Sequence, residues 1–421
     1  MEYGLIGEHL PHSFSKEIHG LCANYDYCLK ELTPQEVPDF LREKNFKAIN
    51  VTIPYKQTVI PFLEKIDAAA AEIGAVNTVI CREGKLYGYN TDFYGMTALL
   101  RHMHLSLRGK KVLILGTGGT ACTARAVAKA EGAAEIRTVG RNKATVDCTY
   151  EEACKSCRDT QVIINTTPCG MYPYADGSEE RAATPINIAS FPGLCGVLDA
   201  VYNPLRTNLV LEAQQRGIPA EGGLYMLVAQ AVKASQLFLG QPEEGLEGKT
   251  DEIYAKIRAE KENIVLIGMP ACGKTTVGKV LAESMNRPFL DTDEEIVRVA
   301  QKSIPDIFAQ EGEEAFRNRE TEAVLQIANQ KSGYVIATGG GAILREENLR
   351  ALRRTGRLYF LNRPLSLLMP TKDRPLASSA EQIKKRYEER FDRYKAACHR
   401  EIAATSAPET LAEIIRKDFL S

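Results

Sequence analysis

The chain has 421 residues, which is too long for one ordinary hydrophobic core and predicts two to three domains. Its 53 Lys and Arg residues are balanced by 54 Asp and Glu residues, giving a formal charge of -1. This balance excludes the broad positive field of a dedicated nucleic-acid binder or of a protein that adheres to anionic membranes. We therefore expect no nucleic-acid or membrane partner, and recognition through local sites.

Residues 1–7 lack the basic region and long apolar stretch of a signal peptide. No segment approaches the ~20 apolar residues that a membrane helix needs. The 11 cysteines are odd in number and scattered through apolar runs, which favours reduced thiols and a cytoplasmic protein. Cys154 and Cys157 form one close pair, which we interpret as structural rather than as a redox or zinc half-site because no second pair accompanies it.

Strand-like apolar runs alternate with helical stretches along the chain, which predicts an α/β fold with parallel sheets. An apolar helix is expected over 224–239 and a strand over 264–267. Between them, Gly and Pro punctuate residues 240–245, and the Lys- and Glu-rich remainder to 262 indicates a solvated helical connector. We expect a domain boundary in this linker, 240–262.

The segment from Gly268 to Thr275 matches the phosphate-binding pattern G-x4-G-K-[ST], entered by strand 264–267 and left by a helix over 275–286. Backbone N–H groups of such a loop, with the positive end of the helix, surround nucleotide phosphates. Lys274 is expected to reach the β- and γ-phosphates, and Thr275 to ligate Mg²⁺. The predicted ATP contacts are Gly268, Cys272, Gly273, Lys274, Thr275 and Thr276.

Three polar signals follow this loop. Asp291 and Asp293 alternate at the end of a short apolar run, so both carboxylates would point the same way and suit a metal and a substrate hydroxyl. Gly312-Glu313, Phe316-Arg317 and Glu320 fall on one helical stretch, and Gly339-Gly340-Gly341 follow a strand over 334–336. Taken singly, these signals also fit a helix cap, a snorkelling arginine and a tight turn.

In this order the motifs resemble shikimate kinase from 263 to about 415, including Arg374-Pro375-Leu376 and Arg390. The resemblance implies that Asp293 contacts the ring hydroxyls and orients or deprotonates the attacking one, and that Asp291 supports Mg²⁺. It assigns the substrate carboxylate to Arg317 and Arg390, the substrate lining to Gly340 and Gly341, and charge neutralisation during phosphoryl transfer to the lid residue Arg374. The segment before Arg374 departs from the family by being short and lacking an arginine.

An earlier strand over 110–115 runs into a glycine turn and a helix to Lys129, the arrangement that places a dinucleotide pyrophosphate on a helix N-terminus. After the next strand, 136–139, the chain carries Arg141 and Lys143 instead of the carboxylate that binds the ribose of NAD. Two cations suit the 2′-phosphate of NADP, although an exposed basic turn would look the same. The predicted contacts are Gly116, Gly118, Gly119, Thr120, Ala121, Arg141 and Lys143.

Each polar motif upstream of this glycine turn, taken alone, also has a purely structural explanation. Ser13 and Ser15 would share a face if the backbone is extended, and Lys56 lies at the mouth of a strand broken by proline. Asp92, in Asn90-Thr91-Asp92, could simply cap a helix over 93–102.

Their order nevertheless resembles shikimate dehydrogenase over roughly 1–240, through Ser-x-Ser, Asn-Val-Thr-x-Pro-x-Lys, Gly-Ala-x-Asn-Thr, Asn-Thr-Asp and Gly-x-x-Met-Leu-x-x-Gln. The resemblance implies that Lys56 and Asp92 form the catalytic pair. It also implies substrate contacts by Ser13 and Ser15 on the carboxylate, by Thr52, Asn77 and Gln230 on ring hydroxyls, and by Tyr202 at the rim. Gly140 and Asn142 depart from the family's 2′-phosphate clamp, so Lys143 is expected to substitute for a second arginine. His12 and His19 are interpreted as packing or capping residues.

These resemblances predict a bifunctional enzyme of chorismate and aromatic amino acid biosynthesis. One half would reduce 3-dehydroshikimate with NADPH, and the other would phosphorylate shikimate with ATP and Mg²⁺. The expected domains are a substrate domain (1–100, completed by 224–239), a Rossmann domain (101–223) and a P-loop kinase domain (263–421). Two alternatives stay open: a dehydrogenase that accepts quinate or prefers NAD, and a regulator that binds ligands without turnover.

Overall fold

A computed structural model describes residues 1–10, 13–172, 184–368 and 379–421. The chain divides into two compact units, Met1–Ile257 and Arg258–Ser421, with the division inside helix α9 (Leu246–Lys261). Within these described ranges, no helix is long and apolar enough to cross a bilayer.

The first sheet of the N-terminal unit has the described strand order β2-β1-β3-β5-β6-β4. Its strands are β1 (Tyr3–Gly7), β2 (Tyr27–Glu31), β3 (Ala48–Val51), β4 (Lys65–Ile66), β5 (Thr78–Arg82) and β6 (Lys85–Tyr89). All pairs are parallel except those of β5, which runs antiparallel to β3 and β6. Its accompanying helices are α1 (Ser15–Cys22), α2 (Val37–Glu43), α3 (Ala68–Ile73), α4 (Thr91–His102) and α8 (Leu224–Leu239). Helix α8 packs against α4 and α1, so a distant part of the chain completes this layer.

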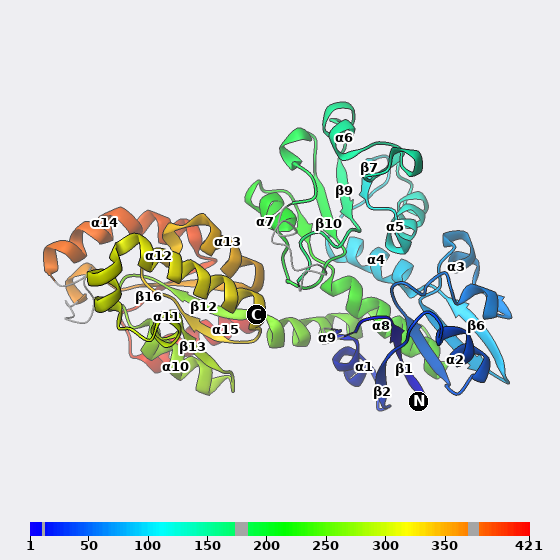
Figure 1. Cartoon of the computed structure of the whole chain (residues 1–421), viewed down its shortest axis with the longest axis horizontal. Coiled ribbons are helices and arrows are strands. Elements are labelled where there is room, and N and C mark those ends of the chain that lie inside the picture. Colours follow the sequence, from blue (N-terminus) through cyan, green and yellow to red (C-terminus); the bar gives the residue numbers. More distant parts are fainter. Residues whose placement is uncertain (11–12, 173–183, 369–378) are drawn as a thin grey trace. The chain divides into compact units, whose positions relative to one another are not determined.

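The second sheet of this unit is parallel, with the described strand order β11-β10-β9-β7-β8. Its strands are β7 (Lys111–Leu115), β8 (Glu135–Val139), β9 (Val162–Asn165), β10 (Gly196–Asp199) and β11 (Ala220–Glu221). Helices α5 (Gly119–Ala130) and α7 (Asn208–Gln215) flank the sheet on opposite sides, and α6 (Tyr150–Ser156) lies near its end (Figure 1). Because β7 lies between β8 and β9, the strand order reverses there, and a ligand crevice is expected at the carboxyl end of β7.

The C-terminal unit contains a third parallel sheet, with the described order β13-β14-β12-β15-β16. Its strands are β12 (Asn263–Ile267), β13 (Phe289–Asp291), β14 (Val335–Ala337), β15 (Gly356–Asn362) and β16 (Arg400–Ala403). Helices α10 (Lys274–Ser284) and α15 (Pro408–Leu420) cover one face, and α12 (Ile304–Gln330), α13 (Glu346–Thr355) and α14 (Ala380–Ala397) lie on the other (Figure 1). Helix α11 (Thr292–Ala300) follows β13. The predicted α/β fold is confirmed.

The predicted helical stretch around Arg317 is broken at Gly312, whose φ of 86° and ψ of 173° interrupt α12. The residues on either side are helical, so the segment consists of two helices joined at a kink. A glycine accepts this positive φ without the steric cost that a Cβ would bring.

Helix α9 differs from the solvated connector expected over 240–262. Leu246, Ile253, Tyr254 and Ile257 are buried in the hydrophobic core of the N-terminal unit. Their spacing forms one apolar stripe in an otherwise charged helix, and the Tyr254 ring lies 5.1 Å from that of Tyr225. The composition of this segment predicts a solvated helix, because its charged residues outnumber the buried ones, and it does not reveal the apolar stripe.

Candidate active sites

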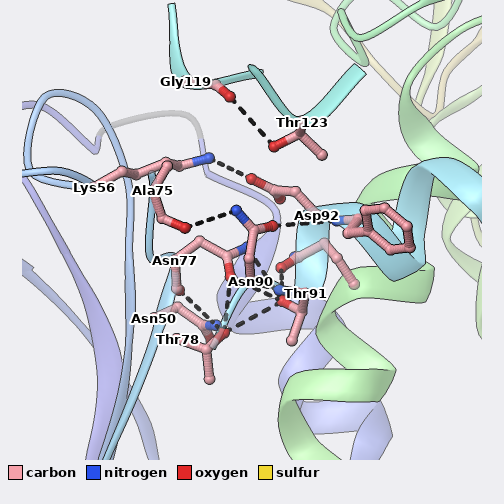
Figure 2. A network of polar contacts seen from close by, with 12 residues as sticks. Asn50, Lys56, Ala75, Asn77, Thr78, Asn90, Thr91, Asp92, Gly119 and Thr123 are labelled. Atoms are coloured by element: carbon pink, nitrogen blue, oxygen red, sulfur yellow. Dashed lines mark hydrogen bonds and ion pairs between the residues drawn. The ribbon is translucent and has the colours of Figure 1, made fainter. Parts of the chain in front are cut away.

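Lys56 and Asp92 form an ion pair in the N-terminal unit, with Nζ of Lys56 2.5 Å from Oδ2 of Asp92 (Figure 2). Their side chains are only 15% and 11% exposed. The carbonyl of Lys56 accepts the Val76 N–H at 2.8 Å, which fixes the loop after β3 against the segment before β5. The resemblance to shikimate dehydrogenase predicts that these two residues form a pair, and the fold brings them into contact. Because both side chains are largely shielded from water, their charges interact strongly.

Asn90 is the N-cap of α4, because its side-chain oxygen accepts the N–H of Phe93 at 3.2 Å. Its amide nitrogen also donates to the carbonyl of Ala75 at 2.9 Å. The alternative in which Asp92 caps a helix over 93–102 is therefore wrong. Asp92 lies in the first turn of α4 (Thr91–His102), where the helix N-terminus favours a carboxylate and leaves its side chain available to Lys56.

Thr91 connects two residues that the resemblance assigned to ring hydroxyls. Its N–H donates to Oδ1 of Asn77 at 2.7 Å, and Nδ2 of Asn77 donates to Oγ1 of Thr91 at 3.1 Å (Figure 2). The Thr91 hydroxyl donates to Oε1 of Gln230 at 3.2 Å. A Cβ on Gly95 would lie 2.6 Å from the carbonyl of Met226. Gly95 thus permits the close approach of α4 and α8 that brings Gln230 beside the network.

Ser13 and Ser15 flank the start of α1 and do not lie on an extended strand. The backbone of Phe14 is helical, and the N–H of Ser15 donates to Oγ of Ser13 at 3.2 Å, so the expected alternation is wrong. Phe14 stands between the two serines in the sequence, and the centroid of its ring lies 5.2 Å from that of Tyr202. Burial raises the pKa of the Tyr202 phenol.

Thr52, the predicted contact of a ring hydroxyl, follows β3 directly and is half-buried. Its N–H donates to the carbonyl of Ile6.

The glycine turn follows β7 as predicted and leads into α5, with Gly118 as its N-cap. Gly116 has φ of 113°, and a Cβ there would lie 2.7 Å from Oγ1 of Thr166, so only glycine fits. A Cβ built on Gly119 would be 3.7 Å from Cδ of Lys56, which places the turn beside the ion pair. Gly118 and Thr120 are accessible at this turn, whereas Ala121 is buried in the core and offers only its backbone.

The predicted 2′-phosphate residues differ in their availability. Arg141 is exposed and makes no hydrogen bond or ion pair with any residue that the structure describes. Nζ of Lys143 lies 2.5 Å from Oε2 of Glu152, a carboxylate that also accepts the Thr149 N–H in a capping box. This ion pair lies at the protein surface, since the Lys143 side chain is 58% exposed.

In the C-terminal unit, the phosphate loop joins β12 to α10, and Gly273 is the N-cap of α10. Lys274 is buried, and its ammonium donates to the carbonyls of Gly268 and Met269 at 2.8 and 2.9 Å. The lysine therefore lies against its own loop. The Cys272 side chain is buried in the core, so it offers only its backbone to a nucleotide, while Thr276 is exposed.

Thr275 and Asp291, the two predicted metal ligands, are in contact. Oγ1 of Thr275 donates to Oδ2 of Asp291 at 2.7 Å. Asp291 is also the N-cap of α11, because Oδ1 accepts the N–H of Asp293 at 3.0 Å. Asp293 consequently lies in the first turn of that helix, and the alternating strand expected for the two carboxylates is wrong. A hydroxyl and a carboxylate are hard oxygen donors, and Mg²⁺ commonly uses one or two protein ligands together with nucleotide phosphates.

Arg317 belongs to a buried ion-pair cluster on α12. Its Nη1 donates to Oε2 of Glu320 at 2.7 Å, and its Nη2 donates to Oε1 of Glu313 at 3.2 Å. Burial lowers the pKa of Arg317, but the two carboxylates outweigh burial and leave it raised. Burial raises the pKa of Glu320, with Arg317 opposing and the charge of Asp293 adding to the rise. A Cβ on Gly339 would lie 2.6 Å from Oδ1 of Asp293 and 2.7 Å from Oε1 of Glu320.

Arg390, on α14, contacts the same glycine segment. Its Nη1 donates to the carbonyl of Gly340 at 3.0 Å, which also accepts the Tyr394 hydroxyl at 2.5 Å. A Cβ on Gly341 would lie 2.0 Å from Nη1 of Arg317, so any side chain there would displace that guanidinium. The two predicted carboxylate-binding arginines thus both lie next to Gly340-Gly341. Arg374 and His12 lie outside the described residues.

Of the two cysteines that are close in the sequence, Cys157 contacts a third cysteine, Cys148. Sγ of Cys157 lies 3.9 Å from that of Cys148, both buried, and Cys154 lies elsewhere on α6. Across the part of the chain that the structure describes, no group of three His, Cys, Asp or Glu side chains could hold a metal ion. His19 is buried and stacks on Tyr27 with ring centroids 3.9 Å apart, in a packing position.

Sequence reasoning missed several residues that hold the two sites. Thr91 received no role, although it stands inside the Asn-Thr-Asp motif. Glu320 was noted only as part of a helical stretch, although it pairs with Arg317. Tyr394 carried no signal at all, because its hydrogen bond to Gly340 joins residues 54 positions apart.

Two family models match separate parts of the chain. Residues 5–79 match the shikimate dehydrogenase substrate binding domain, and residues 270–419 match shikimate kinase. The NADP(+) shikimate dehydrogenase of Clostridium perfringens (strain 13) is 33% identical over 282 residues, covering 61% of this chain and 98% of the relative.

Solved structures resemble the N-terminal unit as well. Shikimate dehydrogenase 1 from Peptoclostridium difficile aligns with a TM-score of 0.55 at 30% identity, over 61% of this chain and 98% of that one. Shikimate 5-dehydrogenase from Thermus thermophilus, solved with NADP(H) and shikimate, aligns with a TM-score of 0.52 at 25% identity, over 60% and 99% of the two chains.

Proposed function

The chain belongs to the shikimate dehydrogenase family and also carries a shikimate kinase domain, so it is an enzyme with NADP, ATP and Mg²⁺ as its cofactors. We propose that it catalyses two successive steps: reduction of 3-dehydroshikimate to shikimate with NADPH, and transfer of the γ-phosphoryl group of ATP to the 3-hydroxyl of shikimate. The observation that carries the first step is the Lys56–Asp92 pair beside the Gly119 turn.

In the reductase site, bound NADPH would supply a hydride to the C3 carbonyl carbon. The ammonium of Lys56 is proposed to donate a proton to the carbonyl oxygen as that oxygen gains charge. Asp92 is proposed to hold the ammonium in place and to accept a hydrogen bond from a ring hydroxyl. The Asn77–Thr91–Gln230 network supports this assignment, because it presents fixed polar groups next to the pair.

The carboxylate of 3-dehydroshikimate is assigned to Ser13 and Ser15, with Thr52 on a hydroxyl and Tyr202 at the rim. Support comes from the contact between Tyr202 and Phe14, which keeps the tyrosine next to the serines. Arg141 is proposed to bind the 2′-phosphate of NADPH, since it is exposed and lies directly after β8.

In the kinase site, Mg²⁺ would be held by Thr275 and Asp291, which already share a hydrogen bond. The ion neutralises phosphate charge when it is bound. Asp293 is proposed to orient the 3-hydroxyl and accept its proton, and Lys274 to leave the carbonyls of Gly268 and Met269 for phosphate oxygens. Arg317 and Arg390 are proposed to hold the carboxylate of shikimate over Gly340 and Gly341.

We also propose that the domains divide near the expected limits, with 1–100 and 224–239 forming the substrate domain, 101–223 the NADP domain and 263–421 the kinase domain. The three separate sheets support this division. The connector between the last two is shorter than expected, since residues 246–257 pack in the N-terminal unit.

A coupled assay of the purified chain tests both steps. With 3-dehydroshikimate, NADPH, ATP and Mg²⁺ together, the expected product is shikimate 3-phosphate, identified by mass. Omitting ATP should stop the reaction at shikimate, and omitting NADPH should leave 3-dehydroshikimate unchanged. An absence of NADPH oxidation in the complete mixture would contradict the reductase assignment, and accumulation of shikimate there would contradict the kinase assignment.

A further inference from the structure

Arg386 carries a buried donor that the proposed mechanism does not use. It lies on α14 one helical turn before Arg390, so the two side chains share a face of that helix. Its Nη1 is shielded from solvent and has no hydrogen-bond partner among the residues that the structure describes. A guanidinium N–H withdrawn from water without an acceptor is costly, so its retention calls for a ligand or a partner.

The surroundings of Arg386 are those of the acceptor site. Burial and the charge of Arg390 lower its pKa, Glu313 opposes them, and the charge of Arg317 also reaches it. Arg386 therefore lies within electrostatic range of the two arginines, Arg317 and Arg390, that contact the glycine segment 339–341. Arg317 already engages Glu313 and Glu320. Arg317 and Arg390 each donate to an acceptor of the protein, whereas Nη1 of Arg386 is buried without one among the described residues.

An organic carboxylate would supply an acceptor for the buried Nη1 of Arg386. It offers about four acceptor positions on two oxygens, so more than one arginine can donate to it at the same time. Arg317 donates through both terminal nitrogens to its glutamates, and Arg390 donates through Nη1 to Gly340. A third arginine with a free N–H would complete the coordination, and charge-assisted bonds of this kind are the strong ones.

We propose that Arg386 is a specificity-determining residue of the kinase site, whose Nη1 donates to the carboxylate of the cyclic acid that Arg317 and Arg390 hold. This inference rests on the proposed kinase activity. It predicts that the domain prefers acceptors with a ring carboxylate, and that Arg386 contributes to binding of the acceptor rather than to phosphoryl transfer.

The test compares Arg386→Leu and Arg386→Lys with the wild-type full chain. Arg386→Leu should raise the KM for shikimate roughly ten- to hundredfold, with kcat and the KM for ATP within about twofold. Arg386→Lys should recover part of this loss, because an ammonium retains the charge without the fork. Lys385→Leu is the matched control on the same helix, since that side chain is 79% exposed and should leave every constant unchanged.

An analogue in which a hydroxymethyl group replaces the carboxylate separates a ligand contact from a structural role. The wild-type chain and Arg386→Leu should bind this analogue equally weakly in calorimetry without ATP. An unchanged KM for shikimate in Arg386→Leu, or an equal further loss of affinity for the analogue, would overturn the inference and assign Arg386 to a contact with Glu313. A wild-type chain that does not phosphorylate shikimate would instead overturn the proposed function together with it.

Discussion

The ammonium of Lys56 and the carboxylate of Asp92, 36 residues apart in the sequence, meet at 2.5 Å between the loop after β3 and the first turn of α4. Neither element could hold the pair alone. The loop is fixed by the bond from the Val76 N–H to the Lys56 carbonyl, and α4 is fixed by its Asn90 cap. The pair is thus held by the backbone on both sides, which suits a group that must donate a proton at one defined position.

We predict that Lys56→Ala lowers NADPH oxidation with 3-dehydroshikimate by about 10²–10⁴-fold, the usual contribution of a positioned proton donor. Phosphorylation of supplied shikimate should stay within about twofold of the wild-type rate, because the kinase residues lie in the other unit. Lys65→Ala, which changes an exposed lysine of β4, is the control. Loss of both activities in Lys56→Ala would contradict independent sites.

Asp293→Asn should have the reverse effect. Phosphorylation of shikimate should fall by about 10²–10⁴-fold, because the amide cannot accept the hydroxyl proton, while NADPH oxidation is retained. Glu294→Gln changes the exposed neighbour in the same helical turn and should leave phosphorylation unchanged. Both rates are measured on the full chain, and wild-type phosphorylation by Asp293→Asn would refute its role as the base.

Arg141 should matter more than Lys143 for the choice of cofactor. Arg141 is exposed, whereas Lys143 is paired with Glu152. We predict that Arg141→Ala raises the KM for NADPH roughly ten- to hundredfold, and that Lys143→Ala raises it by less than about threefold. The KM for NADH, which lacks the 2′-phosphate, should be nearly unchanged in both variants. Equal effects of the two variants would show that Lys143 leaves Glu152 when the cofactor binds.

Sequence reasoning predicted the placement of residues that stand at a fixed position in a motif, while their roles stay predictions. The glycine turn, the phosphate loop and the Lys56–Asp92 pair are of this kind. It failed where local geometry depends on a neighbouring cap: Ser15 begins a helix, and Asp291 caps α11, so neither motif is extended. It also failed for Tyr394, whose hydrogen bond to Gly340 joins distant parts of the chain and leaves no local pattern.

His19 should make the N-terminal unit sensitive to acid. Burial lowers its pKa from 6.5 to about 3, so the folded state keeps it neutral while the unfolded chain takes up a proton below pH 6.5. The unfolded state then binds more protons, and the free energy of unfolding should fall as pH decreases from 6.5 toward 3, by about 1.4 kcal/mol per pH unit from this residue.

His19→Phe keeps a ring to stack on Tyr27 and cannot titrate. Its free energy of unfolding, measured in urea between pH 7 and pH 4.5, should therefore decline less steeply than that of the wild-type unit. His104→Phe is the comparison at an exposed histidine and should retain the wild-type slope. A slope for His19→Phe as steep as that of the wild type would refute the assignment.

The apolar stripe of α9 predicts where the chain can be divided. Fragment 1–245 loses Leu246, Ile253, Tyr254 and Ile257, whose burial together contributes roughly 4 kcal/mol or more. This is a large part of the stability of an ordinary domain. We predict that 1–257 folds and reduces 3-dehydroshikimate, and that 1–245 melts at a clearly lower temperature or is insoluble.

The other fragment should begin before the strand that opens the third sheet. Glu262 is fully buried and pairs with Arg357 at 2.9 Å, and its carbonyl accepts Nη1 of Arg287 at 2.8 Å. Fragment 258–421 keeps these contacts and should phosphorylate shikimate at close to the rate of the full chain. Fragment 263–421 leaves Arg357 without its carboxylate and should be less stable in thermal denaturation. Equal melting temperatures for 258–421 and 263–421 would show that the buried pair contributes nothing net, as some buried ion pairs do.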